Sequence, residues 1–164
     1  MCASSDSSCD HTSQLTWLKN DLAANPTRCT LAYFHHPLFS SGEHGDTQPG
    51  GDDSHVVGWV KPLWDALYAA DADVIVNGHD HNYERFAPQN PSGTADPARG
   101  IREFVVGTGG TSLRSFKTVK PNSEVRNATA RGVLKLTLNS TSYDWEFVPV
   151  AGQTITDSGN GSCH

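Results

Sequence analysis

A chain of 164 residues, of which 36% are hydrophobic and 9% aromatic, can bury a workable core as one domain, and this composition excludes a generally disordered chain. The formal net charge of −6 argues against a nucleic-acid-binding surface, which needs clustered Lys and Arg, and no apolar run approaches the roughly 18 residues of a membrane span. Residues 1–6, MCASSD, are polar from the start, so the sequence predicts no signal peptide.

The first half of the chain predicts two helices that alternate with two strands. Leucines share one face of the first helical segment, which Asn25-Pro26 ends, and apolar residues at spacing 0, 3, 4 and 7 mark the second. In chain order we expect a helix from Thr12 or Ser13 to about Ala24, a strand over Thr30–Phe34, a Gly-rich loop over Ser40–Ser54, a helix over about Trp59–Ala70 and a strand over Val74–Asn77.

The second half is predicted to be mostly β. We expect an apolar strand over Glu103–Gly107 and a polar loop over Arg114–Asn127. The alternating segments Gly132–Asn139 and Ser142–Pro149, separated by a short turn, indicate an antiparallel hairpin. The order α-β-α-β-β-β-β therefore predicts an α/β fold with a mixed β-sheet and flanking helices.

Two histidines follow the strand over Val74–Asn77 with one residue between them. Gly78 lets the backbone turn sharply, and residues two apart in an extended segment point the same way. We therefore expect the imidazoles of His79 and His81 to converge at the mouth of the sheet, where α/β proteins place their chemistry. Imidazole is a suitable ligand for Zn, Fe or Mn, so this segment predicts a metal site.

A second pair of histidines follows the strand over Thr30–Phe34. Pro37 stops the strand and biases His36 towards an extended conformation. His35 is the expected third ligand, provided by a neighbouring strand. His36 is expected either to cap the strand or to lie among the catalytic groups.

The four cysteines, at positions 2, 9, 29 and 163, allow three pairings. Cys2 and Cys9 flank a short polar loop, and a bridge from Cys29 to Cys163 would pin the C-terminal tail to the sheet, so we expect these two disulfides. An even count favours an exported protein, and the alternative is a set of reduced thiols in a cytoplasmic host.

These motifs together resemble a known family. A strand followed by His35-His36-Pro37, a strand followed by Asn-Gly-His-Asp-His at 77–81, and Tyr-Glu-Arg at 83–85 are similar to the C-terminal half of a calcineurin-like metallophosphoesterase of the purple acid phosphatase type. The Gly-His-x-His segment followed by Tyr-Glu-Arg is specific, whereas His-x-Pro alone is weak. The resemblance extends from about Gln14 to the C-terminus.

The chain also departs from this family. The family builds a two-metal centre from five sequence blocks, and the first three, an Asp-x-His, a bridging Asp after Gly and an Asn followed by His, do not precede His35. Gly51–His55 matches the first block only loosely, and we interpret it as loop composition. The resemblance implies half of a four-layer α/β/β/α sandwich, formed by a single domain over 1–164 with loose termini at 1–12 and 151–164.

The resemblance also implies roles for the histidines. His35 and His79 would ligate one metal ion and His81 the other, with Zn, Fe or Mn as the occupant. His44 would be the substrate-side histidine that contacts phosphate or protonates the leaving alkoxide; its alternative is a solvated loop residue. Two further roles are predicted from the residues themselves: Asp80 orients a neighbouring ligand, and the Tyr-Glu-Arg segment, in which Tyr83 matches no family ligand, forms a structural ion pair beneath the site.

The expected function is metal-dependent hydrolysis of a small phosphate ester at an incomplete, His-rich site in a protein that is secreted or periplasmic by ancestry. Three histidines could also hold a single zinc ion with an open position for water. The alternatives are a non-catalytic truncated fragment that binds metal and a subunit that assembles with a partner chain. No nucleic acid or membrane partner is expected.

The predicted sheet has helices for only one of its faces. The other face would expose alternate apolar residues of strands such as Val133–Leu138 and Tyr143–Val148. Large bare apolar patches are rare on monomers, so we expect a homodimer through the sheet face or its edge.

Overall fold

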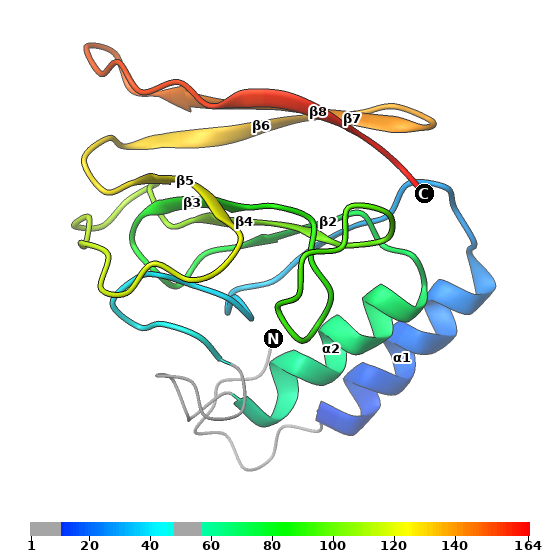
Figure 1. Cartoon of the computed structure of the whole chain (residues 1–164). Helices are drawn as coiled ribbons and strands as arrows, with labels where there is room; N and C mark the ends of the chain where they lie inside the picture. The colour runs from blue at the N-terminus through cyan, green and yellow to red at the C-terminus, as the bar shows by residue number, and fades with distance from the viewer. Residues whose placement is uncertain (1–10, 48–56) are drawn as a thin grey trace.

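The structure, a computed structural model, describes residues 11–47 and 57–164, with the backbone alone described for Val57 and Gly58. The described residues form three layers: a pair of helices, a larger sheet and a smaller sheet (Figure 1). In chain order the elements are α1 (His11–Ala24), β1 (Leu31–Tyr33), α2 (Val57–Ala69), β2 (Val74–Asn77), β3 (Tyr83–Phe86), β4 (Arg102–Val106), β5 (Ser123–Asn127), β6 (Gly132–Leu138), β7 (Ser142–Pro149) and β8 (Ser158–Ser162).

The larger sheet is mixed, as the sequence predicts, and has the strand order β1-β2-β4-β3-β5. β1, β2 and β4 run parallel, while β3 is antiparallel to both β4 and β5. β1 and β2 pair in the register Leu31↔Val74, so their C-terminal ends lie at the same edge of the sheet. The histidine pairs follow these two strands and therefore lie at this edge.

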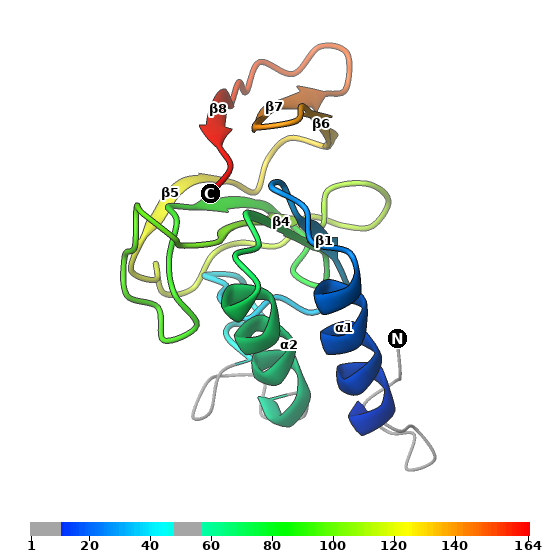
Figure 2. The same ribbon diagram turned by 90° about the vertical axis from the view of Figure 1, so that its right-hand side faces the viewer.

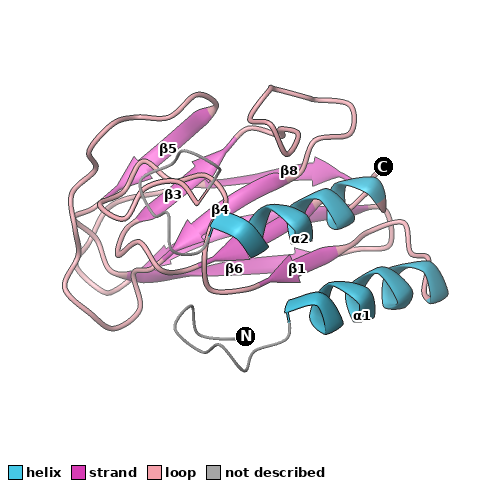
Figure 3. Cartoon of the chain, turned by 90° about the horizontal axis from the view of Figure 1, so that it is seen from below, coloured by secondary structure: helices cyan, strands magenta, loops and turns pink. Residues whose placement is uncertain are grey.

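Both helices lie on one side of the larger sheet (Figure 3). Of the two helices, α2 contributes the fully buried side chains. Its Val60, Trp64 and Leu67 pack against apolar side chains of the sheet. These residues belong to the predicted 0, 3, 4, 7 stripe, which is confirmed. α1 contributes the partly buried Leu18 and Leu22. Neither described helix has the length and apolar content needed to cross a membrane.

The second sheet, of order β6-β7-β8, covers the opposite face of the larger sheet (Figure 2). The rings of Phe147 and Tyr83 lie 4.4 Å apart between their centroids, and those of Trp145 and Phe104 lie 5.7 Å apart. The predicted hairpin is confirmed, but it belongs to a separate sheet. Our expectation of a bare sheet face is therefore wrong, because the chain covers that face itself.

The C-terminal segment is a strand of the second sheet. β8 pairs with β7, and the predicted disulfide between Cys29 and Cys163 is present with an S–S distance of 2.00 Å. Our expectation of a loose terminus over 151–164 is therefore wrong for the residues of β8 and for Cys163. The predicted Cys2–Cys9 bridge and the expected loose residues 1–10 lie outside the described part of the chain.

Besides β8, two strands occupy segments that were not predicted to be β. β3 contains the Tyr-Glu-Arg motif, and β5 lies at the end of the expected loop over Arg114–Asn127. The side chains of β3 alternate in direction. Tyr83 and Arg85 face the second sheet, where the Arg85 guanidinium lies 5.0 Å from the centroid of the Trp145 ring, while Glu84 faces the loop that follows His36.

Candidate metal centre

The parallel pairing of β1 and β2 brings His35, His36 and His79 together. The pairing continues past the strands, since Phe34 N donates to Val76 O at 3.1 Å and Gly78 N donates to His35 O at 2.9 Å. One ring nitrogen from each of the three histidines lies within 4.8 Å of the others. The rings of His36 and His79 are 4.3 Å apart between centroids.

The spacing of two of these nitrogens matches that of ligands on one metal ion. His35 Nε2 and His79 Nδ1 lie 3.3 Å apart. Two nitrogens bound tetrahedrally at roughly 2.0–2.1 Å from zinc would lie about 3.4 Å apart. Imidazole donors suit Zn, Fe and Mn, so the residues present fit the transition metal that the sequence implies.

The turn that carries His79 is tighter than the extended segment we expected. Asp80 N donates to Gly78 O at 2.8 Å and Asn82 N donates to Asp80 O at 2.9 Å, which are two successive three-residue turns. His79 itself has a φ of 66°, whereas Gly78 has no positive φ. The convergence of His79 with His35 thus results from a left-handed residue, and the i, i+2 argument was wrong for this segment.

His44 and His81 lie close to this group of three histidines. The His44 ring lies 4.4 Å from the His79 ring and 6.2 Å from the His81 ring, measured between centroids. His81 is outside the group of three, and its buried Nδ1 atom has no hydrogen-bond partner among the described residues. A buried nitrogen in this state is available to a ligand that the chain does not provide. The roles of His35, His36, His44, His79 and His81 remain predictions.

Asp80 positions the loop that carries His44. Its buried carboxylate accepts hydrogen bonds from Ser40 Oγ and, at 2.9 Å, from His44 N. A Cβ at Gly42 would lie 2.3 Å from the Asp80 carboxyl carbon, so this close approach requires glycine. Asp80 therefore orients a neighbouring histidine of the cluster.

Two buried glutamates also accept hydrogen bonds from the backbone of the loop that carries His44. Glu103 Oε1 accepts from Leu38 N at 3.0 Å, and Glu84 Oε2 accepts from Ser41 N at 2.8 Å. Burial raises the pKa of both carboxyl groups above the usual value, and the hydrogen bonds from the loop only partly offset this. The loop between the two histidine pairs is thus held by three carboxyl side chains.

The ion pair of the Tyr-Glu-Arg segment is not the one we expected. Arg85 Nε donates to Asp157 at 2.8 Å and Tyr83 Oη donates to the same carboxylate at 2.6 Å, so Glu84 takes no part. Burial opposes ionisation of Asp157, but the hydrogen bonds from Arg85 and Tyr83 outweigh it and lower the pKa of this group. The network lies between the two sheets and joins them.

Arg114 is a charged residue beside the cluster that sequence reasoning missed. Its Nη1 atom lies 3.0 Å from His44 Nε2, and its backbone N donates to His81 O at 2.9 Å. It belongs to a polar segment with no periodic pattern, so only the preceding Thr-Gly-Gly at a strand end pointed to this region. The Asp and His residues of Gly51–His55 lie outside the described part of the chain.

Curated proteins whose sequences are similar to this chain are acid phosphatases. No protein-family model matches the chain. The chain is 31% identical over 142 residues to purple acid phosphatase 18 of Arabidopsis thaliana, covering 82% of this chain and 30% of the relative. It is 35% identical over 80 residues to tartrate-resistant acid phosphatase type 5 of Rattus norvegicus, covering 49% and 22%. It is also 30% identical over 129 residues to a probable inactive purple acid phosphatase 1 of Arabidopsis thaliana, covering 73% and 20%.

Solved structures give the same fold. Purple acid phosphatase PPD1 of yellow lupin superposes with a TM-score of 0.71 at 23% identity, over 91% of this chain and 28% of that chain. GAP50 of Plasmodium, described as the anchor in the inner membrane complex, superposes with a TM-score of 0.70 at 17% identity, over 94% and 43%.

The layers and strand order therefore define part of a metallophosphoesterase fold. Within that class, the chain resembles a calcineurin-like metallophosphoesterase of the purple acid phosphatase type. It spans between 20% and 30% of the length of the curated relatives that it matches.

Proposed function

We propose that the chain is a metal-dependent phosphoester hydrolase whose centre is the histidine cluster. The observation that carries this proposal is the group of His35, His36 and His79, which has one ring nitrogen from each within 4.8 Å of the others, just past the C-terminal ends of the parallel strands β1 and β2. Similarity to purple acid phosphatases supports phosphate esters as the substrate class.

The residues of the cluster divide into two sets in this proposal. His35 and His79 hold the first Zn, Fe or Mn ion, with His36 beside them, and His81 serves a second ion. When bound, such ions polarise phosphoryl oxygens and generate hydroxide near neutral pH. His44 lies within ring contact of His79 and faces the substrate, where its imidazole contacts the phosphoryl group or gives a proton to the leaving alkoxide.

The second candidate is a non-catalytic, metal-binding module. One finding favours it: the relatives include one described as probably inactive. Such a protein would keep the metal without turning over phosphate esters, alone or with a partner chain that supplies the missing ligands.

Hydrolysis of a chromogenic phosphate monoester by the metal-loaded protein separates the two candidates. We expect low activity that a chelator abolishes and that His79→Ala removes. A matched control is His164→Gln, because His164 lies 3.2 Å from Asp73, at the other end of β2 from His79. Absence of activity in a protein that holds metal would favour the non-catalytic module, and activity that survives chelation would contradict both.

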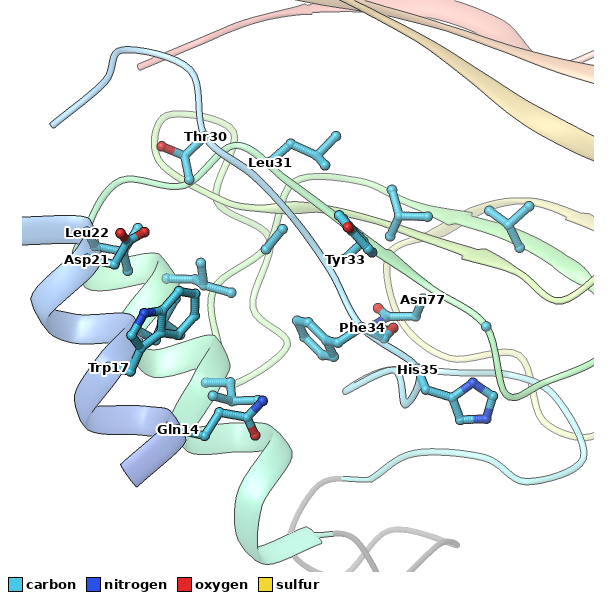
Figure 4. A pocket seen from close by; sticks show the side chains of 17 residues that line it. Gln14, Trp17, Asp21, Leu22, Thr30, Leu31, Tyr33, Phe34, His35 and Asn77 are labelled. Carbon is cyan, nitrogen blue, oxygen red and sulfur yellow. Dashed lines mark hydrogen bonds between the residues drawn. The ribbon is translucent and has the colours of Figure 1, made fainter. Parts of the chain in front are cut away.

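We also propose that self-association, which the sequence predicts, uses the edge of β1. The sheet face is covered, but β1 has a single neighbour among the described strands. Beside it lies a groove of about 870 Å³ between α1 and β1, where Trp17 and Tyr33 are 62% and 81% exposed (Figure 4). A second copy could add its own β1 across a two-fold axis and cover these rings. Light scattering of wild type and Tyr33→Asp tests this: we expect a dimer that the charge weakens, and a wild-type monomer at micromolar concentration would contradict it.

Export to an oxidising compartment is the proposed location. The Cys29–Cys163 disulfide supports it, because such bonds persist in secreted or periplasmic proteins and are rare in the cytosol.

A further inference from the structure

The segment after β4 lies beside the histidine cluster and is hydrogen-bonded to His81 and to the loop that carries His44. Arg114 N donates to His81 O at 2.9 Å, Lys117 N donates to Ser41 O at 2.9 Å, and Lys117 Nζ donates to Glu43 O at 2.7 Å. The backbone on both sides of Arg114 is therefore fixed relative to the loop that carries His44.

The Arg114 guanidinium lies between the cluster and solvent. One nitrogen, Nη1, is 3.0 Å from His44 Nε2 and 3.2 Å from Glu43 Oε2, and the side chain is 38% exposed. An arginine can only donate, so His44 Nε2 accepts in this contact and carries no proton there. Both contacts use the same nitrogen, Nη1, and an exposed pair with Glu43 contributes little stability.

A phosphoryl group is a better partner for this guanidinium than His44 or Glu43, the two residues that it contacts in the structure. The planar fork of arginine matches two oxygens of a phosphate in a bidentate contact, which is stronger and more directional than a single contact to a neutral imidazole. Local charge supports the same ligand, since Lys117 lies on the same segment although the chain as a whole has a net charge of −6.

We propose that Arg114 is the residue that binds the substrate's phosphoryl group and selects phosphate monoesters over diesters. On binding, the guanidinium leaves His44 and takes two terminal oxygens of the phosphoryl group. A monoester has three terminal oxygens and up to two negative charges, whereas a diester has two and one. This inference rests on the proposed function, because the phosphoryl group is placed beside the histidine cluster.

The test measures binding of inorganic phosphate, methyl phosphate and dimethyl phosphate to the zinc-loaded protein by calorimetry. We expect Arg114→Gln to weaken phosphate and methyl phosphate at least tenfold and dimethyl phosphate by a smaller factor, because the diester offers the guanidinium two oxygens but only one negative charge. The monoester preference should therefore decrease. Arg114→Lys keeps the charge without the fork and should recover only part of the affinity. Arg126→Gln is the matched control, since Arg126 lies on β5 and bonds Ser123, and it should bind like wild type.

Zinc content, measured on the same samples, separates the two proposals. A protein that holds zinc but binds phosphate equally well as wild type and as Arg114→Gln overturns the role of Arg114 and leaves the metal centre intact. An equal loss for the monoester and the diester would show that Arg114 only fixes the segment, and would also overturn it. A protein without zinc that still shows the Arg114-dependent preference would contradict the metal centre and retain the anion site.

Discussion

His79 is held in a conformation that a histidine seldom adopts. Its φ of 66° places it in the left-handed region, which costs a non-glycine residue on the order of 1–3 kcal/mol. The surrounding contacts maintain it, because the turns at Asp80 and Asn82 and the bond from Gly78 N to His35 O fix the backbone on both sides. The strain places the His79 ring next to His35, which is the geometry that the metal proposal requires.

Glu103 is a buried acid that we expect to govern pH-dependent stability. Its side chain is fully buried, and burial raises its pKa well above the unfolded value. The folded protein therefore binds a proton that the unfolded chain has lost, and this stabilisation is present at low pH and lost as pH rises towards the folded pKa. Each pH unit in this window changes the free energy of unfolding by up to about 1.4 kcal/mol.

Glu103→Gln should therefore flatten the pH dependence of the melting temperature. The amide keeps the acceptor for Leu38 N and never ionises, so we expect the variant to gain stability over wild type between pH 5 and pH 8. Thermal unfolding followed by circular dichroism measures this, with the exposed Glu146→Gln as a control. A variant that loses stability equally at both pH values would show that Glu103 acts through shape alone.

The proximity of His35 and His79 could be predicted from the sequence, whereas the directions of the histidine side chains could not. Histidines after two parallel strands must lie at the same edge of a sheet, so His35 and His79 could be brought together from pattern alone. The side-chain directions could not be predicted, since the turn at His79 is not extended. The group of ring nitrogens contains His36 and not His81. Arg114 could not be found because it approaches through a loop whose path depends on tertiary contacts.

At the scale of elements, the end of β4 packs directly on the turn that carries the His79–His81 pair. A Cβ at Gly107 would lie 1.8 Å from Asp80 O, a backbone atom that cannot move aside alone. We expect Gly107→Ala to destabilise the protein by roughly 1–3 kcal/mol and to weaken metal binding, because the turn must shift. Gly109→Ala is the matched control, since a Cβ there has no atom within 4 Å.

Chemical denaturation and zinc titration of both variants measure the two effects. Equal stability and equal zinc affinity of Gly107→Ala and wild type would contradict the coupling of β4 to the histidine turn.

The elements that were predicted correctly are those in which the buried apolar residues follow a simple pattern along the sequence. α2 and β2 are examples, with a helical stripe and a continuous apolar run. β8 was missed because its sequence, SGNGS, has no apolar residue; its glycines make room for aromatic rings, as a Cβ at Gly159 would lie 2.4 Å from Trp145 Cζ2. β3 was missed because it contains a buried charged residue. Arg85 lies under the second sheet, so the strand lacks the apolar pattern that is typical of a buried strand.

At the scale of the whole molecule, one disulfide joins the two sheets. Cys29 precedes β1 and Cys163 follows β8, at a sequence separation of 134 residues. Loops this long give a chain-entropy stabilisation of about 5 kcal/mol, and removal of native disulfides typically costs about 2–5 kcal/mol. We expect the Cys29→Ser, Cys163→Ser double variant to melt roughly 4–20 °C lower than wild type, as measured by calorimetry. An unchanged melting temperature would show that the contacts between the sheets suffice.

The central claim is that the histidines after β1 and β2 form one metal site, and zinc titration against a competing chelator tests it most directly. We predict at least one tightly bound zinc ion per chain in wild type and in His164→Gln. In His79→Ala we expect the zinc affinity to be at least tenfold weaker, because the variant removes the ring nitrogen that lies 3.3 Å from His35 Nε2. Wild-type protein that binds no zinc, or His79→Ala that binds it as tightly as wild type, would contradict the account.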